Sequence, residues 1–297
     1  MPLRDFALLT FVCIAWAANN IVSKFAVTHL GVPPMFYAAM RFAVVLAVTF
    51  PWLRNLPRPI WKLALVGLMM GGGTFSLVFI ALKTSSPSAV AIVSQLGVPI
   101  TALLSYFMLG ERLNGRRLFG MALTIAGVLL VMWNPQGFAV SSGLMFVVAA
   151  SCFGSFAAVL MKQMDGVKPL QFQAMVGLAS FVPTIGLSIL FEPGNVEAAR
   201  AAGWPFVAAV LFSGLFVSVV AHTLYYGLIQ RHEATLISPL TLMTPLATIA
   251  MGVVLTGDEF GPRLALGTAL ALAGVLVIAL RRNQVWALAL AVRNRWP

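Results

Sequence analysis

The chain has 297 residues, of which 60% are hydrophobic and only 9% are charged. A soluble domain carries about 25% charged residues, so this composition excludes a water-soluble protein and indicates a lipid bilayer as the solvent. The formal net charge is +11. The Lys and Arg residues are distributed as expected for the cytoplasmic loops of a membrane protein, so we expect no nucleic-acid partner.

Apolar runs between Gly, Pro and charged residues predict ten membrane-spanning helices, since a span needs about 20 residues. The runs lie near residues 6–28, 35–53, 60–82, 87–109, 117–133, 143–164, 170–190, 205–229, 234–256 and 263–280. The fourth contains Pro99 and the ninth contains Pro245, which membrane helices tolerate as kinks. The last segment, 283–297, is too short to span and is expected to be a cytoplasmic, interfacial tail.

The two halves of the chain repeat one another. Residues 83–113 correspond to residues 230–260, so that Pro99 falls on Pro245. Because five spans per half is an odd number, the second half must be inverted relative to the first. We expect an all-α membrane protein of ten transmembrane helices in two inverted five-helix repeats, residues 1–136 and 137–282. Such halves around a midplane site are the usual construction of secondary transporters.

Positive charges orient the spans, because cytoplasmic loops carry an excess of Lys and Arg. With the N-terminus inside, the outer side keeps only Lys24, Lys83, Arg200 and Arg263, and Arg41 lies within a span. The cytoplasmic side receives Arg4, Arg54, Arg58, Lys62, Arg112, Arg116, Arg117, Lys162, Lys168, Arg231, Arg281, Arg282, Arg293 and Arg295. This bias predicts a multi-pass protein of the inner membrane with both termini in the cytoplasm and the loop 134–142 outside.

Several short motifs point to a family. They are Trp16-Ala17-Ala18-Asn19-Asn20 followed by Lys24, Arg41 in the second span, Pro99 with Leu109-Gly110-Glu111-Arg112, and Arg231-His232-Glu233-Ala234 followed by Ser238-Pro239-Leu240 and Pro245. Over essentially the whole chain they resemble the drug/metabolite transporter superfamily, in the branch with two EamA-type domains. The stretch around Pro239 is most similar to bacterial exporters of cysteine and O-acetylserine. The family usually has Gly at Ala17 and Gly-Glu where Gly257-Asp258-Glu259 stands.

One face of the first span carries candidate substrate-binding residues. Trp16, Asn20 and Lys24 follow i, i+4 spacing and therefore share a face that could line a polar cavity. Alternatively, Lys24 reaches the outer headgroups as an anchor. In the third span, Phe79 is also assigned to the substrate site.

Further candidates lie in the fourth, eighth and ninth spans. His222 has Tyr226 four residues later, and its reference pKa of about 6.5 makes it titratable near neutral pH. It has a cavity or coupling role, or is a structural histidine. Gln95 and Thr241 are equivalent in the repeat, each four residues before its proline. Both suit a midplane site beside loosened backbone, or a hydrogen bond between helices.

Arg41, Pro99 and Pro245 are assigned structural roles. Arg41 lies about 9 Å into its span at 1.5 Å per residue, where a charge is costly without a partner. We expect its guanidinium to bind helix-end carbonyls and lock neighbouring helices, with contact to an anionic substrate as the alternative.

The expected function is export of small metabolites, most of all amino acids or their derivatives, by alternating access. The alternatives are a sugar-phosphate or nucleotide-sugar-like carrier, a drug efflux carrier, a channel-like conduit and a membrane enzyme. An enzyme would need a nucleophile, an acid pair or a metal cluster, and Cys13 and Cys152 lack metal-ligand spacing. We expect no metal, no cofactor, and a monomer or weak dimer. No acid lies mid-span, so the usual proton relay is missing, although a proton counter-ion remains an alternative.

Overall fold

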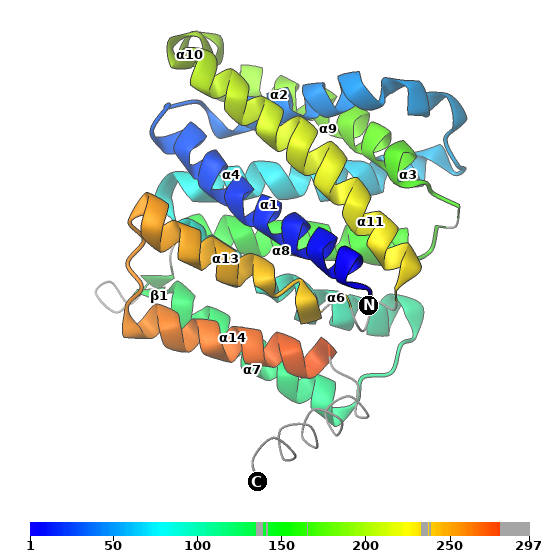
Figure 1. The fold of residues 1–297 in the computed structure, drawn as a ribbon, viewed down its shortest axis with the longest axis vertical. Helices are drawn as coiled ribbons and strands as arrows, with labels where there is room; N and C mark the ends of the chain where they lie inside the picture. Colours follow the sequence, from blue (N-terminus) through cyan, green and yellow to red (C-terminus); the bar gives the residue numbers. More distant parts are fainter. Residues whose placement is uncertain (135–138, 141, 165, 233–236, 238, 280–297) are drawn as a thin grey trace.

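The computed structural model of the protein is a bundle of helices (Figure 1). It describes residues 1–134, 139–140, 142–164, 166–232, 237 and 239–279. The predicted tail 283–297, most of the loop 134–142, part of the 231–238 motif and the four arginines beyond residue 280 lie outside these residues. Within them, the only strands are β1 (Trp133–Asn134) and β2 (Ala139–Val140), which form one short antiparallel pair.

The first half contains α helices, the 3-10 helices η1 and η3 and the π-helix η2. Its elements are α1 (Leu3–Thr28), α2 (Pro34–Thr49), η1 (Phe50–Asn55), α3 (Ile60–Leu68), η2 (Met69–Gly73), α4 (Thr74–Thr84), α5 (Pro87–Val93), η3 (Ser94–Leu96), α6 (Gly97–Leu109) and α7 (Gly115–Met132).

The second half follows the same plan, with the π-helices η4 and η5. Its described elements are α8 (Ser142–Met161), α9 (Pro169–Phe191), α10 (Asn195–Leu211), η4 (Phe212–Ala221), α11 (His222–Arg231), α13 (Met243–Met251), η5 (Gly252–Thr256) and α14 (Pro262–Ala279).

Nine helices of the described part are long and apolar enough to cross a membrane, and Met243–Thr256 forms a shorter apolar helix. Most boundaries lie within a few residues of the predicted ones. The eighth differs, because its helix begins at Asn195 and not near residue 205. Gly203, with φ 59° and ψ −140°, interrupts it, and this left-handed φ suits a residue without Cβ. The predicted start thus corresponds to the second segment of a kinked helix.

Helices of both halves are interrupted at corresponding places. A proline has no N–H, so the carbonyl four residues earlier loses its α-helical partner. Ahead of Pro99 the chain forms η3, and ahead of Pro245 it forms a turn at residues 241–242. The Thr241 carbonyl accepts from Thr244 N at 2.9 Å instead. The predicted loosening of the backbone before each proline is therefore present.

The third and eighth helices both contain widened π-turns. Across η2, the hydroxyl of Thr74, the first residue of α4, donates to the Met69 carbonyl at 2.8 Å. In η4, the Ser218 hydroxyl donates to the Ser213 carbonyl, also at 2.8 Å. Each hydroxyl pairs with a carbonyl five residues earlier and so supplies a partner within the widened turn.

Corresponding helices of the two halves make corresponding contacts. Figure 1 shows α7 and α14 side by side, and α2 packs against α9 in the same way. In addition, α1 contacts α13, while its counterpart α8 contacts α6. At the α7–α14 contact, a Cβ on Gly127 would meet the backbone of Gly267 and Ala271. Small residues therefore allow this close approach, as is common between membrane helices.

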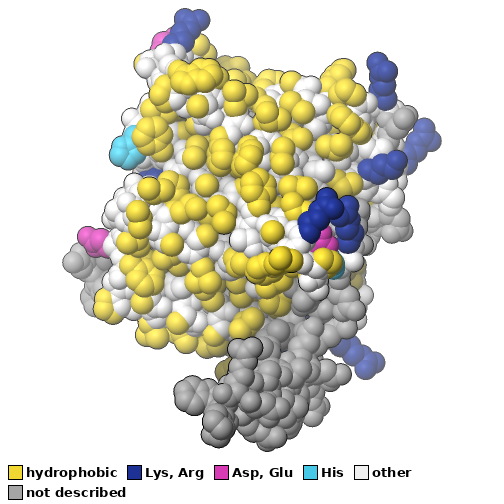
Figure 2. Space-filling model, in the orientation of Figure 1, with side chains coloured by type: hydrophobic (Ala, Val, Ile, Leu, Met, Phe, Trp, Pro, Cys, Tyr) yellow, Lys and Arg dark blue, Asp and Glu magenta, His cyan; other side chains and the backbone are white. Residues whose placement is uncertain are grey.

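The surface has the character of a membrane protein. Figure 2 shows hydrophobic side chains over the broad face of the bundle, with most Lys and Arg side chains gathered along one edge. Leu190, Trp204 and Val254 are more than 70% exposed, which fits contact with lipid. Both the basic edge and the apolar face agree with a chain that crosses a bilayer repeatedly.

Candidate functional site

A cavity of about 900 Å³ lies inside the bundle, among α1, α2, α4, α6, α8, α9 and α11. Its inner lining includes Arg41 and His222, and its outer lining includes Glu111, Arg117 and Lys162. The side chains of these last three residues are 39%, 39% and 50% exposed. The cavity therefore reaches the surface where α6 and α8 finish, and we call this its open end.

Five rings form what we call the aromatic wall: Trp16, Phe75, His222, Tyr225 and Tyr226 all line the cavity. The Trp16 ring lies 4.8 Å from Tyr225 and 5.2 Å from His222, measured between centroids. The Phe75 ring lies 6.4 Å from His222. Contact of α1 with α11 brings these side chains together. Trp16 Nε1 is buried without a partner among the described residues, so the wall also offers a hydrogen-bond donor.

His222 is held by the backbone of its own helix. Its Nδ1 lies 2.9 Å from the Val217 carbonyl. A carbonyl oxygen can only accept, so this hydrogen bond assigns the ring proton to Nδ1. In the neutral ring, Nε2 is then left as a hydrogen-bond acceptor and as the place where a second proton would bind.

Arg41 is the charged residue in the inner part of the cavity, and its side chain is fully buried. Its Nε donates to the Ser218 hydroxyl at 2.8 Å, and its Cζ lies 3.7 Å from the Phe75 centroid. Nη1 is buried without a partner in the described part of the chain. The expected bonds to helix-end carbonyls are not among its hydrogen bonds there, because the Ser218 hydroxyl and the Phe75 ring take that place.

Charged side chains pair with one another at the open end. Lys162 Nζ lies 3.2 Å from Glu111 Oε1 and 3.4 Å from the Ser105 hydroxyl. Arg117 Nη1 lies 3.8 Å from Glu111 Oε2. These groups are partly exposed, so each pair contributes ~0–1 kcal/mol and can open readily.

The opposite end, which we call the closed end, is held by part-buried polar contacts. Asp258 Oδ2 accepts from the Ser88 N–H at 2.9 Å and from the Ser88 hydroxyl at 2.5 Å. The Thr256 hydroxyl donates to Oδ1 at 2.8 Å. Lys24 Nζ donates to the carbonyls of Leu82 and Ser85 at 2.8 and 3.2 Å. A cation at the carboxyl end of α4 is also favoured by the helix dipole.

The structure brings together only part of the predicted site. Trp16, His222, Tyr226 and Thr241 line the cavity with Arg41, whereas Asn20, Lys24, Phe79 and Gln95 are not among the lining residues. Asn20 Nδ2 lies 3.5 Å from Thr248 Oγ1, and Gln95 Nε2 donates to the Ala91 carbonyl at 3.3 Å. Phe79 is fully buried, 4.9 Å from the Tyr37 ring. Pro99 and Pro245 are buried beyond the two helix interruptions.

The reason for this division lies in the length of the shared helix face. Eight residues separate Trp16 from Lys24, a rise of about 12 Å at 1.5 Å per residue. The face is shared, but the cavity ends before its outer part. Lys24 therefore contacts the closed end and not the interior.

Other lining residues were not anticipated. Gln173 lines the cavity and is 3% exposed. The sequence could have indicated it, because its side chain is a polar amide within an apolar span. Nothing in the sequence indicated that Phe75 and Ser218 contact Arg41. Their orientation toward Arg41 depends on the π-helices η2 and η4.

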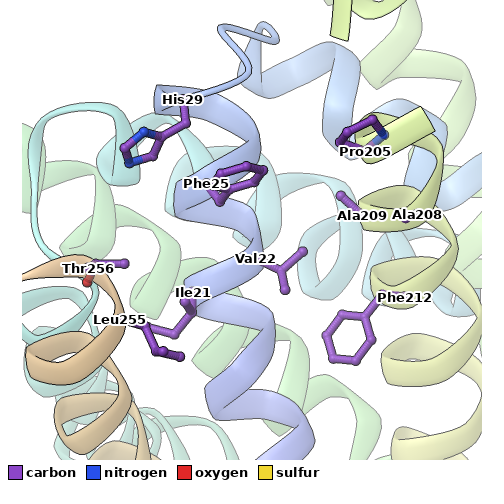
Figure 3. Close-up of a pocket in the computed structure, with 10 residues that line it drawn as sticks. All are labelled: Ile21, Val22, Phe25, His29, Pro205, Ala208, Ala209, Phe212, Leu255 and Thr256. Carbon is purple, nitrogen blue, oxygen red and sulfur yellow. The ribbon is translucent and has the colours of Figure 1, made fainter. Parts of the chain in front are cut away.

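A second hollow, of about 530 Å³, is an apolar groove that flanks α1. Figure 3 shows Val22, Phe25 and His29 on α1, with Phe212 on one side and Leu255 on the other. Its lining contains no Lys, Arg, Asp or Glu side chain among the described residues. It therefore lacks the placed charges and donors by which the inner cavity could select a polar ligand.

Comparisons with known proteins agree with a transport cavity. The model of the EamA-like transporter family matches residues 6–133 and 141–280. A probable amino-acid metabolite efflux pump of Salmonella typhimurium is 27% identical, over 93% of this chain and 95% of that protein. A protein of the same name from Escherichia coli K12 is 24% identical with the same coverage. An uncharacterized inner membrane transporter of E. coli K12 is 25% identical over 85% of this chain and 83% of its own length.

A solved structure supports the fold. A protein crystal structure superposes with a TM-score of 0.64 at 23% sequence identity. The match covers 93% of this chain and 98% of the other. The helical arrangement described above is therefore one that an experimentally determined protein also adopts.

Proposed function

Since the chain belongs to the EamA-like transporter family, we propose that it is a secondary transporter that exports small metabolites across the inner membrane by alternating access. Amino acids and amino-acid derivatives are the proposed substrates. The names of the Salmonella and E. coli relatives support this class.

The observation that carries the proposal is a cavity with one open end and one closed end. The open end has half-exposed, weakly held ion pairs around Glu111, and the closed end has the part-buried Ser88–Asp258 contact. Alternating access requires a site that reaches one side of the membrane at a time. The described conformation has this property, and exchange of the two ends would expose the cavity to the other side.

In the proposed topology, the open end faces the cytoplasm. The N-terminal end of α1, residues 54–62 and residues 112–117 lie at this end, and Lys and Arg are frequent there. The positive-inside rule then places both termini in the cytoplasm. Substrate would enter from the cytoplasm and leave outside, which is the direction of export.

We also propose ten transmembrane helices in two inverted five-helix repeats, residues 1–136 and 137–282. The two segments matched by the family model support this division. The reciprocal contacts of α1 with α13 and of α8 with α6 support a two-fold relation between the repeats. The oligomeric state in this proposal is a monomer or weak dimer.

The coupling mode follows from the charges of the lining. Among the described lining residues, Glu111 is the only carboxylate, and it lies at the open end. Carboxylates are frequent proton relays in transporters, so the proposal is passive export, with proton coupling through His222 as the alternative.

Purified protein in proteoliposomes tests the transport function. Vesicles preloaded with an unlabelled amino acid or its acetylated derivative should take up the labelled compound faster than unloaded vesicles. The double variant Trp16→Ala/Tyr226→Ala removes part of the aromatic wall and should lose this uptake. Flux that rises linearly with concentration and ignores the preload would indicate a conduit and contradict a carrier. In cells, efflux should fall on gene deletion and rise on overexpression.

A further inference from the structure

The inner part of the cavity carries one positive charge. The charged residues of the described lining are Arg41, Glu111, Arg117 and Lys162. The last three pair with one another at the open end and are 39–50% exposed. Arg41 is fully buried and has no carboxylate among its partners in the described part of the chain. An uncompensated buried charge is costly, so the site is electrostatically incomplete when empty.

The guanidinium keeps donors for a ligand. Phe75 covers one face of it at 3.7 Å, but the N–H groups of Arg point outward in the plane of the guanidinium. Nε is used by Ser218, whereas Nη1 is buried without a partner among the described residues. Since Nη1 is enclosed, a ligand reaches it only when a neighbouring side chain moves.

From this arrangement we propose that Arg41 binds the carboxylate of an organic monoanion, so that the substrates are amino-acid derivatives whose amine is acylated or absent. The inference rests on the proposed transport function and names its substrate class. The fork of Arg matches a carboxylate, which can accept two hydrogen bonds at once.

A free amino acid fits the same site less well. Its carboxylate would satisfy Arg41, but its ammonium group would then need an anion, and the inner lining offers aromatic rings, hydroxyls and amides. Acylation removes that charge and leaves an N–H donor. His222 has Nε2 available as an acceptor, and its ring lies 6.4 Å from Phe75, which covers Arg41. The aromatic wall would then enclose the apolar part of the ligand.

The charge of such a substrate determines what drives its export. An anion that leaves a cell with a negative interior moves down the membrane potential. Each 100 mV changes its equilibrium distribution about 50-fold. A monoanion exporter therefore needs no coupling ion, which agrees with a described inner lining that has no carboxylate relay.

Proteoliposomes with an imposed potassium diffusion potential test this proposal. The probes are leucine, methionine and phenylalanine, each as the N-acetyl acid, the free amino acid and the amino-acid amide. For wild type, we expect saturable flux of the N-acetyl acids that reverses with the sign of the voltage. We expect at least tenfold slower flux of the free amino acids and the amides. Arg41→Gln should abolish N-acetyl acid flux, Arg41→Lys should retain part of it, and Arg200→Gln, on exposed α10, should match wild type.

The outcomes separate the two proposals. Flux of free amino acids equal to or faster than that of the N-acetyl acids would overturn the anion site and leave the transporter intact. So would voltage-insensitive flux of the N-acetyl acids, or full activity in folded Arg41→Gln. If wild type carries none of the nine probes, the proposed substrate class fails and the anion site fails with it.

A measurement on wild type covers the case in which the Arg41 variants do not fold. In detergent, N-acetyl-leucine should raise the unfolding temperature of the protein, because ligand that binds only the folded state stabilises it. Leucine and leucine amide at the same concentration should give a smaller shift. Equal shifts for all three compounds would overturn the proposal.

Discussion

Ser88 donates both its N–H and its hydroxyl to one carboxylate oxygen of Asp258, at 2.9 and 2.5 Å. The two residues belong to different halves of the chain. Glu111 holds the position that corresponds to Asp258 in the repeat, and it pairs with half-exposed Lys162 and Arg117 at the open end. The same position of the repeat thus makes a part-buried contact at one end and an exposed contact at the other.

Asp258→Asn should weaken the closed end. Hydrogen bonds to a charged group contribute ~1.5–3 kcal/mol and neutral ones ~0.5–1.5 kcal/mol, so the closed end loses about 1–2 kcal/mol. The conformation open at that end should gain population about 5- to 30-fold.

Labelling of a cysteine that lines the cavity measures this shift. In a background without Cys13 and Cys152, Ser94→Cys should react faster with an impermeant maleimide applied from the closed-end side when Asp258→Asn is present. Glu259→Gln, an exposed neighbour, is the matched control. Equal rates for the two variants would show that the Ser88–Asp258 contact does not hold this end.

Trp16→Ala should raise the half-saturation concentration for transport about tenfold, because aromatic contacts contribute ~0.5–1.5 kcal/mol beyond the area that they bury. Trp16→Phe keeps an aromatic ring but loses the Nε1 donor and part of the ring area, so its effect should lie between those of wild type and Trp16→Ala. Trp61→Ala, at a position 68% exposed, should leave transport unchanged. Concentration-dependent flux in proteoliposomes measures all three. Unchanged kinetics in a stable Trp16→Ala variant would place the substrate elsewhere.

A pH gradient alone, with the voltage clamped at zero, should give no uphill accumulation of substrate in wild type. The physical reason is that the described inner lining offers no carboxylate relay. His222→Asn should behave as wild type in this assay. Accumulation in wild type that disappears in His222→Asn would instead establish proton coupling through that ring.

Gly127→Ala should destabilise the protein by about 1–3 kcal/mol, the usual cost of overpacking. The new Cβ would meet the backbone of α14 at Gly267 and Ala271, and backbone cannot turn aside as a side chain can. At Gly186 a Cβ would meet nothing within 4 Å, so Gly186→Ala is the matched control. Thermal unfolding in detergent measures both. Equal unfolding temperatures would show that the α7–α14 contact adapts easily.

The sequence indicated the membrane class, the positions of most spans and the loosened backbone before each proline, because these depend on hydropathy and on local chemistry. It did not indicate which polar residues would meet. Trp16 and Lys24 share a helix face, yet Trp16 lines the cavity and Lys24 makes hydrogen bonds at the closed end. A shared helix face does not specify how deep in the membrane each residue lies.

The partners of Arg41 were also beyond sequence reasoning. Ser218 and Phe75 approach the guanidinium from η4 and from α4 just after η2. A π-turn has no strong composition signal, so the rotation that it gives to the following residues appears only in three dimensions. The depth of Arg41 was foreseen, but its neighbours were not.

The widened turns at η2 and η4 also bear on how this chain tolerates changes in length. A π-turn holds one residue more than an α-turn at the same place. Deleting one residue there would close the widened turn to an α-turn and leave the residues beyond it near their present phase, whereas a deletion within a regular α-helix rotates everything beyond it by about 100°. Loss of one residue from Phe212–Ala221 would thus leave His222, Tyr225 and Tyr226 facing the cavity, whereas loss of one residue from α1 ahead of Trp16 would turn one part of that helix relative to the other. The widened turns are therefore places where this chain can lose a residue and keep the phase of the helix that follows.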